Sequence, residues 1–320
     1  MDLAILTSGG DCAGMNPAIK YFVERCCQGG HRPWAVSNGL EGLIDGEIKP
    51  LAYADVSGII YLGGSILRCS RSKRFYDLAH RRTAAEQLAS RGIDGLVVLG
   101  GEGSFQAVQS LHEVGSSISC VGIPATIDND VPGCRYSLGV DSALNVIRRS
   151  IDEIRDTAAS FRRAFVIETM GRRSGYLAMV SAIVSGAEVC IIPEIPHDLA
   201  SMKIRLGKEF ESRRNYAIAV VAEAVKGVGP EVVNWFRDEL SIDSRLTVLG
   251  HTQRGGSPTV YDRLAAVEFV EQALVGLEAG EEGFAVVRED AGIRRRQFAE
   301  LPSKSELSPR LLALAERLCR

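Results

Sequence analysis

The sequence predicts an α/β protein built on mainly parallel β-sheet. Short apolar runs rich in β-branched residues recur along the 320 residues, with helical patterns between them. This spacing is typical of parallel sheets that are buried on both faces. Glycine and polar residues directly follow the runs, and ligands of such proteins bind at the carboxyl ends of strands. A chain of this length forms either one large domain or two.

The apolar runs mark the expected strands. They occupy residues 3–6, 95–99, 119–123, 165–168, 189–192, 217–221, 246–249 and 284–287. No internal repeat, low-complexity tract or proline-rich linker interrupts the pattern. Any division into domains must therefore come from crossings of the chain between them.

The loops that follow the strands carry the residues able to do chemistry. They read TSGGDCAGMNPAIK, GGEGSF, PATIDND, ETMGRRSG, AEAV and GHTQRGGSP. Because parallel strands end at the same edge of a sheet, these loops predict a crevice lined by glycine backbone, acids, arginines and a histidine. PATIDND alone would be read as an ordinary turn, since Asp and Asn stabilise turns. Its neighbours favour a site.

Two of these loops suit phosphate. In SGGDCAGMNPAIK the glycines allow close backbone approach, and Asn16-Pro17 predicts a helix start whose N–H groups face an anion. GGEGSFQAV repeats the arrangement with Glu102 inside it. Two such loops indicate a polyphosphate ligand, although one alone often serves only packing. Neither matches GxxxxGK[ST] or GxGxxG, which disfavours P-loop and ordinary dinucleotide sites.

Arginines accompany the same loops. The stretch LRCSRSKRF begins at residue 67, and Arg172 and Arg254 lie in glycine-containing loops that follow strands. A bidentate guanidinium suits phosphate at such places. Nucleic acid is the rival ligand, but no aromatic stacking pattern accompanies these arginines. The formal net charge of −3 also argues against a generally basic nucleic-acid binder.

Composition excludes several other classes of protein. With 46% hydrophobic and 24% charged residues, the chain is not of the disordered type. The 8 cysteines have no CxxC spacing, which disfavours a metal cluster or a disulfide framework. The start MDLAILTSGGD fits neither a signal peptide nor a transit peptide, and no apolar run approaches the roughly 20 residues of a membrane span. We therefore expect a cytoplasmic protein with neither membrane nor nucleic-acid partners.

Taken in order, these loops resemble the phosphofructokinase family, in its bacterial-type ATP-dependent form, along essentially the whole chain. The motifs are TSGGD at 7–11, GMN at 14–16, GGEGS at 100–104, TIDND at 126–130, MGR at 170–172, PE at 193–194 and LGHTQRGGSP at 249–258. The resemblance implies two doubly wound α/β lobes with the active site in the cleft between them. Residues 1–138 plus 251–303 would bind nucleotide, and residues 139–250 plus 304–320 would bind the sugar phosphate.

The resemblance also implies a reaction. In this family the γ-phosphoryl group of ATP passes, with Mg²⁺, to the 1-hydroxyl of fructose 6-phosphate, a step of glycolysis. Asp128 matches the catalytic base, Thr126 a contact of the transferring group, and Asp130 an acid near the metal. Arg71 and Arg172 match the arginines that neutralise charge on that group. A carboxylate near arginines stays ionised, as a base must.

Binding residues are carried over in the same way. The nucleotide site matches Gly10, Arg71, Ser72, Gly101, Glu102, Gly103 and Ser104, with Glu102 at the magnesium position, where many members have aspartate. Sugar-phosphate contacts within one subunit match Thr126, Ile127, Asp128, Met170, Gly171, Arg172, Glu223, His251 and Arg254. Arg163 and Arg245 match arginines that reach the 6-phosphate from a neighbouring subunit. The resemblance thus implies a homo-oligomer with shared sites, and we expect a homotetramer.

The departures from the family pattern concern the donor and the effectors. An acid at position 103 and a lysine at 125 go with pyrophosphate, whereas this chain has Gly103 and Ala125, which favours ATP. Leu40 stands where an adenine-side tyrosine is common. The positions that hold effectors in bacterial members match Lys20, Glu24, Tyr53, Arg155, Glu188, Ser212 and Arg214. This set has few cations for a diphosphate, so we expect weak regulation by ADP or phosphoenolpyruvate.

Three other functions stay open at this point. A pyrophosphate-dependent phosphofructokinase is one. A catalytically silent regulatory subunit of the same fold is another, although Asp128 and the arginines of the motifs are all present. A nucleotide-binding oxidoreductase ranks below both, because GxGxxG with an acid about 20 residues later is missing.

Overall fold

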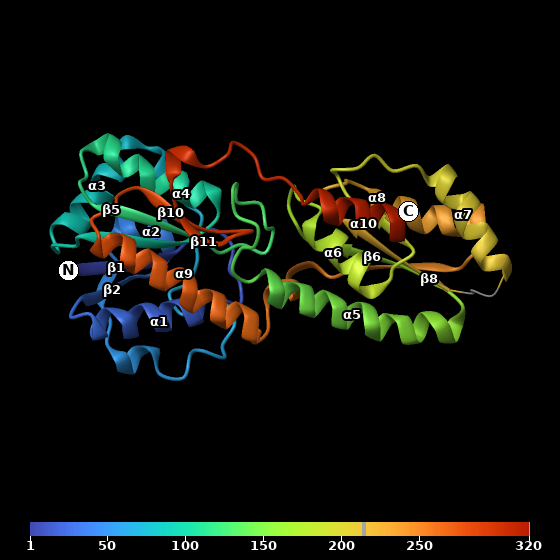
Figure 1. Ribbon diagram of the computed structural model, residues 1–320, viewed down its shortest axis with the longest axis horizontal. Helices are drawn as coiled ribbons and strands as arrows, with labels where there is room; N and C mark the ends of the chain where they lie inside the picture. The colour runs from blue at the N-terminus through green and yellow to red at the C-terminus, as the bar shows by residue number, and fades with distance from the viewer. Residues whose placement is uncertain (213–215, 320) are drawn as a thin grey trace. The chain divides into compact units, whose positions relative to one another are not determined.

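The apolar runs form two mainly parallel sheets, each in its own compact unit of the chain (Figure 1). The computed structural model describes residues 1–212 and 216–319. Unit 1 comprises Met1–Ser142 and Arg254–Ser305, and unit 2 comprises Ala143–Gln253 and Glu306–Arg320. The chain thus passes from one unit to the other after residues 142, 253 and 305. The boundaries of the predicted lobes were at 138/139, 250/251 and 303/304. Their assignment to nucleotide and to sugar phosphate stays a prediction.

The sheet of unit 1 has the strand order β11-β10-β5-β4-β1-β2-β3. Its strands are β1 (Asp2–Thr7), β2 (Arg32–Val36), β3 (Ile48–Pro50), β4 (Gly95–Gly100), β5 (Ser119–Pro124), β10 (Phe284–Glu289) and β11 (Gly292–Gln297). Neighbouring strands from β10 to β2 are parallel, and the edge strands β3 and β11 are antiparallel to their partners. The central strands β1 and β4 are buried along their whole length.

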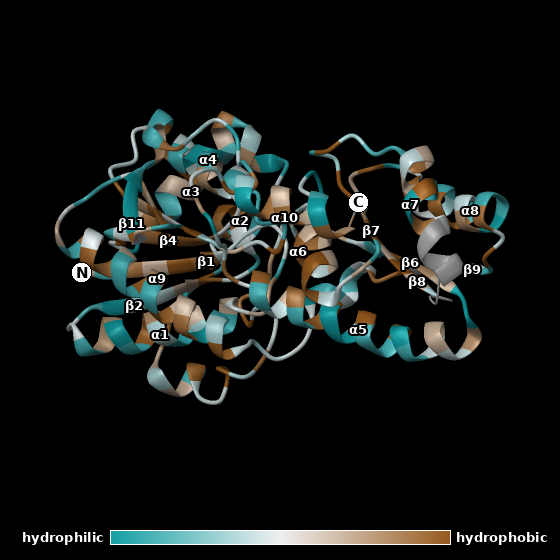
Figure 2. Cartoon of the chain, turned by 45° about the vertical axis from the view of Figure 1, so that its right-hand side comes forward, coloured by the Kyte–Doolittle hydropathy of each residue, from teal (hydrophilic) through white to brown (hydrophobic). Residues whose placement is uncertain are grey.

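Helices cover both faces of this sheet. The helices are α1 (Met15–Gln28), α2 (Gly39–Asp45), α3 (Leu78–Ala89), α4 (Glu102–Gln109) and α9 (Val260–Glu278). Ala4 and Leu6 of β1 pack in one core with α2, α3 and α4, while α1 and α9 lie side by side on the opposite face (Figure 1). Figure 2 shows the hydrophobic residues concentrated in strands such as β1 and β4. Burial on both faces explains why the strands are continuous apolar runs.

Unit 2 has a smaller sheet with the order β7-β8-β6-β9, in which all neighbours are parallel. The strands are β6 (Ala164–Thr169), β7 (Val189–Ile191), β8 (Ala217–Ala222) and β9 (Ser244–Val248). The helices are α5 (Val140–Phe161), α6 (Tyr176–Ser185), α7 (Leu199–Ser212), α8 (Val228–Leu240) and α10 (Pro309–Cys319). Met202 and Phe236 bring α7 and α8 onto one core with the sheet.

The sequence did not predict β2, β3 and β11. β2 begins with Arg32-Pro33, β3 has only 3 residues, and β11 carries Arg294, Arg295 and Arg296. β3 and β11 are edge strands with one neighbour each, so their side chains stay largely exposed and need not be apolar. β11 pairs with β10 across a tight turn, and β3 pairs with β2 after the intervening helix α2.

One buried carboxylate joins the two segments of unit 1, at the points where the chain leaves this unit and returns to it. Asp262 has 0% exposure and accepts hydrogen bonds from the backbone N–H groups of Gly139 and Ser142, both at 2.8 Å, and from the Ser142 hydroxyl at 2.7 Å. The N–H of Thr259 donates to that same hydroxyl at 3.0 Å. The start of α5 and the start of α9 are therefore fixed to each other.

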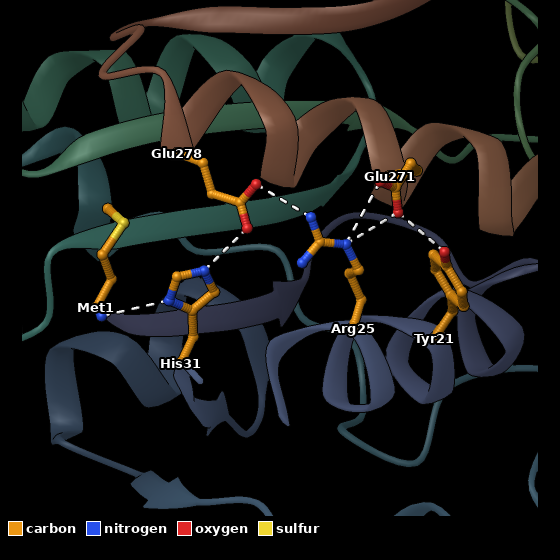
Figure 3. Close-up of polar contacts among 6 residues, drawn as sticks. All are labelled: Met1, Tyr21, Arg25, His31, Glu271 and Glu278. Atoms are coloured by element: carbon orange, nitrogen blue, oxygen red, sulfur yellow. Dashed lines mark hydrogen bonds and ion pairs between the residues drawn. The ribbon is translucent and has the colours of Figure 1, made fainter. Parts of the chain in front are cut away.

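A second polar cluster joins α1 to α9 on the surface of unit 1 (Figure 3). The Arg25 guanidinium donates to Glu271 at 3.2 Å and to Glu278 at 3.0 Å, and Tyr21 donates to Glu271 at 2.9 Å. His31 reaches Glu278 at 2.9 Å. The hydrogen bond from His31, together with that from Arg25, holds the pKa of Glu278 below the ordinary value. The ionised carboxylate therefore stabilises the folded state.

Replacing Glu278 with Gln should lower the free energy of unfolding by about 0.5 to 1 kcal/mol at pH 7, the upper range for partly exposed ion pairs. Because the folded pKa is depressed, this stabilisation is present above the ordinary value of 4.5 and is lost as the pH falls. Denaturant titrations at pH 7 and near pH 3.5 should show a smaller difference between variant and parent at the lower pH. The exposed Glu282 provides a control: Glu282→Gln should have no effect at either pH. Equal destabilisation by Glu278→Gln at both pH values would contradict the ion-pair explanation.

Candidate active site

In unit 1, the three loops that the sequence predicts to bind phosphate or to carry the catalytic acids lie next to one another. β1, β4 and β5 are parallel neighbours, so the loops that follow them leave the sheet at the same edge. Adjacent strands are about 4.8 Å apart. The sheet therefore brings together Gly10, the stretch 101–104 and the stretch 126–130, as the sequence predicted.

The loop after β1 is held against a neighbouring segment that carries Arg71. The Thr7 hydroxyl donates to the carbonyl of Arg68 at 2.8 Å, and the N–H of Gly9 donates to the carbonyl of Ser70 at 3.2 Å. Ser72 Oγ accepts from the N–H of Phe75 at 3.1 Å. Arg71 itself is exposed. The hydrogen bonds to the carbonyls of Arg68 and Ser70 therefore hold the backbone that carries its guanidinium.

Arg254 lies against the same loop. Its Nη1 donates to the carbonyl of Asp11 at 2.9 Å. A Cβ on Gly10 would come within 2.2 Å of that nitrogen, so only glycine allows the guanidinium this approach. The structure thus places Arg254, predicted as a sugar-phosphate contact, beside Gly10 of the predicted nucleotide site.

The loop after β4 presents the start of a helix. Glu102 is the first residue of α4, Gly101 is its N-cap, and the Glu102 carboxylate accepts from Gln106 Nε2 at 2.9 Å. Ser104 is buried and packs beneath Gly100, where a Cβ would lie 2.6 Å from its hydroxyl. A Cβ on Gly103, in contrast, would meet no atom within 4 Å. The helix start is open to a ligand, and its N–H groups and dipole favour an anion.

The loop after β5 is shaped by an asparagine that the sequence interpretation did not single out. Asn129 has a left-handed backbone with φ of 50°, which Asn adopts more readily than most residues. Its Oδ1 accepts from the N–H of Ser137 at 2.8 Å, and its Nδ2 donates to the carbonyl of Arg135 at 3.0 Å. The N–H of Asp128 donates to the Thr126 hydroxyl at 3.2 Å. Asn129 therefore fixes the turn that carries Asp128; its position inside TIDND was the available signal.

In unit 2, side chains from several loops converge on the backbone of residues 170–175. The N–H groups of Gly171 and Arg172 donate to Glu223 Oε1 at 3.2 and 2.8 Å, and the N–H of Gly175 donates to Glu194 Oε1 at 2.8 Å. Arg172 has a φ of 58°, so the loop is held in a conformation that such residues rarely adopt. Glu223, predicted as a substrate contact, here serves the loop that carries Met170 and Arg172.

Arg163 and Arg245 lie at the amino ends of strands in the same sheet, opposite the carboxyl ends that carry the other predicted residues. Arg163 directly precedes β6 and Met170 directly follows it, so the two are roughly 20 Å apart at about 3.3 Å per residue. Asp243 pairs with Arg163 at 2.6 Å and also with Arg245. Although desolvation opposes it, the hydrogen bond from Arg245 and the nearby positive charges hold the pKa of Asp243 below the ordinary value. Within unit 2, these arginines do not join the loops that carry Met170, Glu223 and His251.

The predicted effector residues are already engaged with their own chain. Lys20 pairs with Glu24 at 2.6 Å and lies 5.2 Å from the ring centre of Tyr53. Arg155 donates to the carbonyl of Ser185, and the buried Glu188 accepts from the N–H of Ile218 at 2.7 Å. Arg214 and the side chain of Ser212 lie outside the described residues.

Among the described residues, no three or more His, Cys, Asp or Glu side chains gather as a metal site. Glu102 offers an exposed carboxylate at the start of α4. Mg²⁺ commonly takes one or two carboxylates and completes its shell with phosphates and waters, so this donor fits the ion. Within residues 1–212 and 216–319, no helix is both long and apolar enough to cross a membrane.

Residues 2–277 match the family described as Phosphofructokinase. Among curated relatives, the "ATP-dependent 6-phosphofructokinase" of Sulfurovum sp. (strain NBC37-1) is 54% identical over 289 residues, which are 90% of this chain and 88% of the relative. The relative of that name from Sulfurimonas denitrificans is 48% identical over 317 residues, 99% of each chain.

Solved structures agree with the sequence relatives. The phosphofructokinase from Saccharomyces cerevisiae is 33% identical with a TM-score of 0.87, over 93% of this chain and 45% of the yeast chain, so this chain spans less than half of that protein. The pyrophosphate-dependent phosphofructokinase from Marinobacter aquaeolei has a TM-score of 0.83 at 21% identity, over 96% and 85% of the two chains, a likeness of fold alone. The predicted α/β fold class is confirmed. With a family match over residues 2–277 and relatives of similar length that share about half of its residues, this chain belongs to the phosphofructokinase family.

Proposed function

We propose that this protein is an ATP-dependent 6-phosphofructokinase, which transfers the γ-phosphoryl group of ATP to the 1-hydroxyl of fructose 6-phosphate in glycolysis. The names of the curated relatives support this function. The observation that carries it is the neighbouring position of two loops in unit 1: β4 ends at an open helix start, and β5 ends at Asp128. The first suits a polyphosphate, and the second supplies a proton acceptor.

Each residue has a distinct task in the proposed reaction. The start of α4 and the glycine loop after β1 bind the phosphates of ATP, and Arg71 and Arg172 neutralise charge on the transferring group. Thr126 contacts the transferring group, and its hydroxyl also accepts from the N–H of Asp128. Asp128 takes the proton of the attacking hydroxyl. Phosphoryl transfer needs positioning, charge neutralisation and one base, and these residues supply all three.

Glu102 is the residue proposed to hold Mg²⁺ together with the phosphates of ATP. When bound, the ion neutralises phosphate charge and orients the donor. The chain's own contribution at this point is a carboxylate at the amino end of α4, held by Gln106. Asp130 is proposed as a nearby acid that serves the water shell of the ion.

Sugar-phosphate binding is proposed for the loops of unit 2 and for a second copy of the chain. Met170, Arg172, Glu223 and His251 follow strands at the carboxyl edge, and Arg254 continues the last of these loops. Arg163 and Arg245 lie at the opposite edge, which supports their service to the site of another subunit. We therefore propose a homo-oligomer, in the form of a homotetramer, in which unit 1 binds the nucleotide and unit 2 binds the sugar phosphate. The cytoplasmic location stays a prediction.

The pyrophosphate-dependent alternative is disfavoured by two positions. The open space around Gly103 is available to the ATP chain, whereas an acid there would repel the α-phosphate. Ala125 is 1% exposed and offers no cation to hold a shorter donor. The silent-subunit alternative predicts a broken site, but Asp128, Arg71 and Arg172 are all retained.

The function and the donor are tested by initial rates with fructose 6-phosphate and Mg²⁺. We expect a higher kcat/KM with ATP than with pyrophosphate, and Gly103→Asp should lower kcat/KM for ATP about 100-fold, because like charges in contact cost several kcal/mol. The added Cβ finds open space, so the variant should fold normally. Gly103→Asn, of equal size without the charge, should lose much less. Higher kcat/KM with pyrophosphate in the unmodified enzyme would reverse the donor assignment.

Asp128→Asn should lower kcat by roughly 10² to 10⁴, the range for loss of a general base, and should leave KM for fructose 6-phosphate within a few-fold. The amide keeps the size of the side chain but accepts no proton. Steady-state kinetics measure both constants, and a thermal melt checks that the variant is folded. Near-normal turnover in a folded variant would remove Asp128 from the mechanism.

Oligomers assembled from an Arg163→Ser subunit and an Asp128→Ser subunit should regain part of the activity that each variant lacks. A site completed by a second copy would be intact wherever normal Asp128 meets normal Arg163. Activity should be measured after the two variants are unfolded and refolded together, with each variant refolded alone as control. Mixed oligomers as inactive as their parents would contradict the shared site.

A further inference from the structure

Gln253 is a buried amide whose two ends join the loops that follow β9 and β6. Its side chain is 1% exposed. Oε1 accepts from the N–H of Met170 at 3.1 Å, and Nε2 donates to the carbonyl of Gly250 at 2.9 Å. Because one end accepts and the other donates, these contacts fix the orientation of the amide.

Gln253 completes a set of acceptors around the loop 170–175. Glu223, which follows β8, accepts from the N–H groups of Gly171 and Arg172, and Glu194, which follows β7, accepts from the N–H of Gly175. Gln253 supplies the remaining connection, from the loop after β9 to Met170. The loop 170–175 itself follows β6, and each of the other three strands in the sheet of unit 2, among the described residues, thus sends a loop to its backbone.

The loop needs these external acceptors because one of its residues has an unfavourable conformation. Arg172 has a φ of 58°, and strained backbone persists only where its surroundings determine it. Loss of Gln253 Oε1 would leave the N–H of Met170 without its acceptor in a partly buried place, at a cost that favours rearrangement of the loop.

We propose that Gln253 is a positioning residue for the sugar-phosphate site. By holding Met170 at a fixed place relative to Gly250, it sets the spacing between the Met170–Arg172 backbone and His251. The inference rests on the proposed function, in which these residues contact fructose 6-phosphate. A shift of about 1 Å in such groups can cost as much as 100-fold in rate, so the amide acts on the substrate without touching it.

Gln253→Met keeps the length of the side chain and removes both hydrogen bonds. We expect kcat/KM for fructose 6-phosphate to fall about tenfold, the upper value of one hydrogen bond, mainly through KM, with KM for ATP within twofold of the parent. Thr252→Val is the matched control, because Thr252 Oγ1 donates to the carbonyl of Leu249 at 2.6 Å in the same turn. It should leave both KM values within twofold.

Gln253→Glu separates positioning from packing by its pH dependence. A protonated carboxyl group can accept from the N–H of Met170 and donate to the carbonyl of Gly250, whereas the ionised form has no donor for that carbonyl. Burial raises the pKa of such a carboxyl group. Relative to the parent enzyme, kcat/KM of this variant should therefore rise as the pH falls from 8 to 6, and the ratio for Gln253→Met should stay flat.

The outcomes distinguish this inference from the function on which it rests. If the parent enzyme does not phosphorylate fructose 6-phosphate, the proposed function fails. If the parent is active and Gln253→Met keeps KM for fructose 6-phosphate within twofold, the positioning role is wrong. The positioning role is also wrong if Gln253→Met melts at a lower temperature and its kcat/KM falls by the same factor for ATP and for fructose 6-phosphate. It is wrong as well if kcat/KM of Gln253→Glu, relative to the parent, does not change with pH.

Discussion

The buried carboxylate of Asp262 is the contact on which the arrangement of unit 1 depends. The chain leaves this unit after residue 142 and returns at residue 254, and Asp262 binds the segments on both sides of that excursion. Burial raises the pKa of this carboxyl group, and the hydrogen bonds from Ser142 and Gly139 oppose that shift. A charge or a polar group in the core is tolerable only with such partners. Here they fix where α5 and α9 begin.

The direction of the strands imposes the second constraint. Side chains that follow parallel neighbouring strands meet at one edge, so Gly10, Glu102 and Asp128 gather without being close in sequence. The same rule separates Arg163 from Met170 by the length of β6. In the proposed oligomer, a sugar-phosphate site that uses both would therefore draw on two chains.

Backbone strain recurs where the candidate site is built. Asn129 and Arg172 both have positive φ, and each lies in a loop that hydrogen bonds hold from outside. Conformations of this kind are stable only when neighbouring groups over-determine them. Glu223 and Asn129 are thus bound to backbone, and the groups they position are the ones that can face a ligand.

The sequence by itself determined the fold class, most strands and the motifs of the family, because buried parallel strands must be apolar and their following loops carry glycine and acids. The sequence did not predict strands β3 and β11, because the side chains of edge strands stay exposed and can be polar. Only the tertiary structure placed Arg254 on Gly10, joined Arg163 to Asp243, and linked Gln253 to Met170. These contacts join residues far apart in the chain, and their geometry comes from the packing of strands and loops, which no local pattern of residues records.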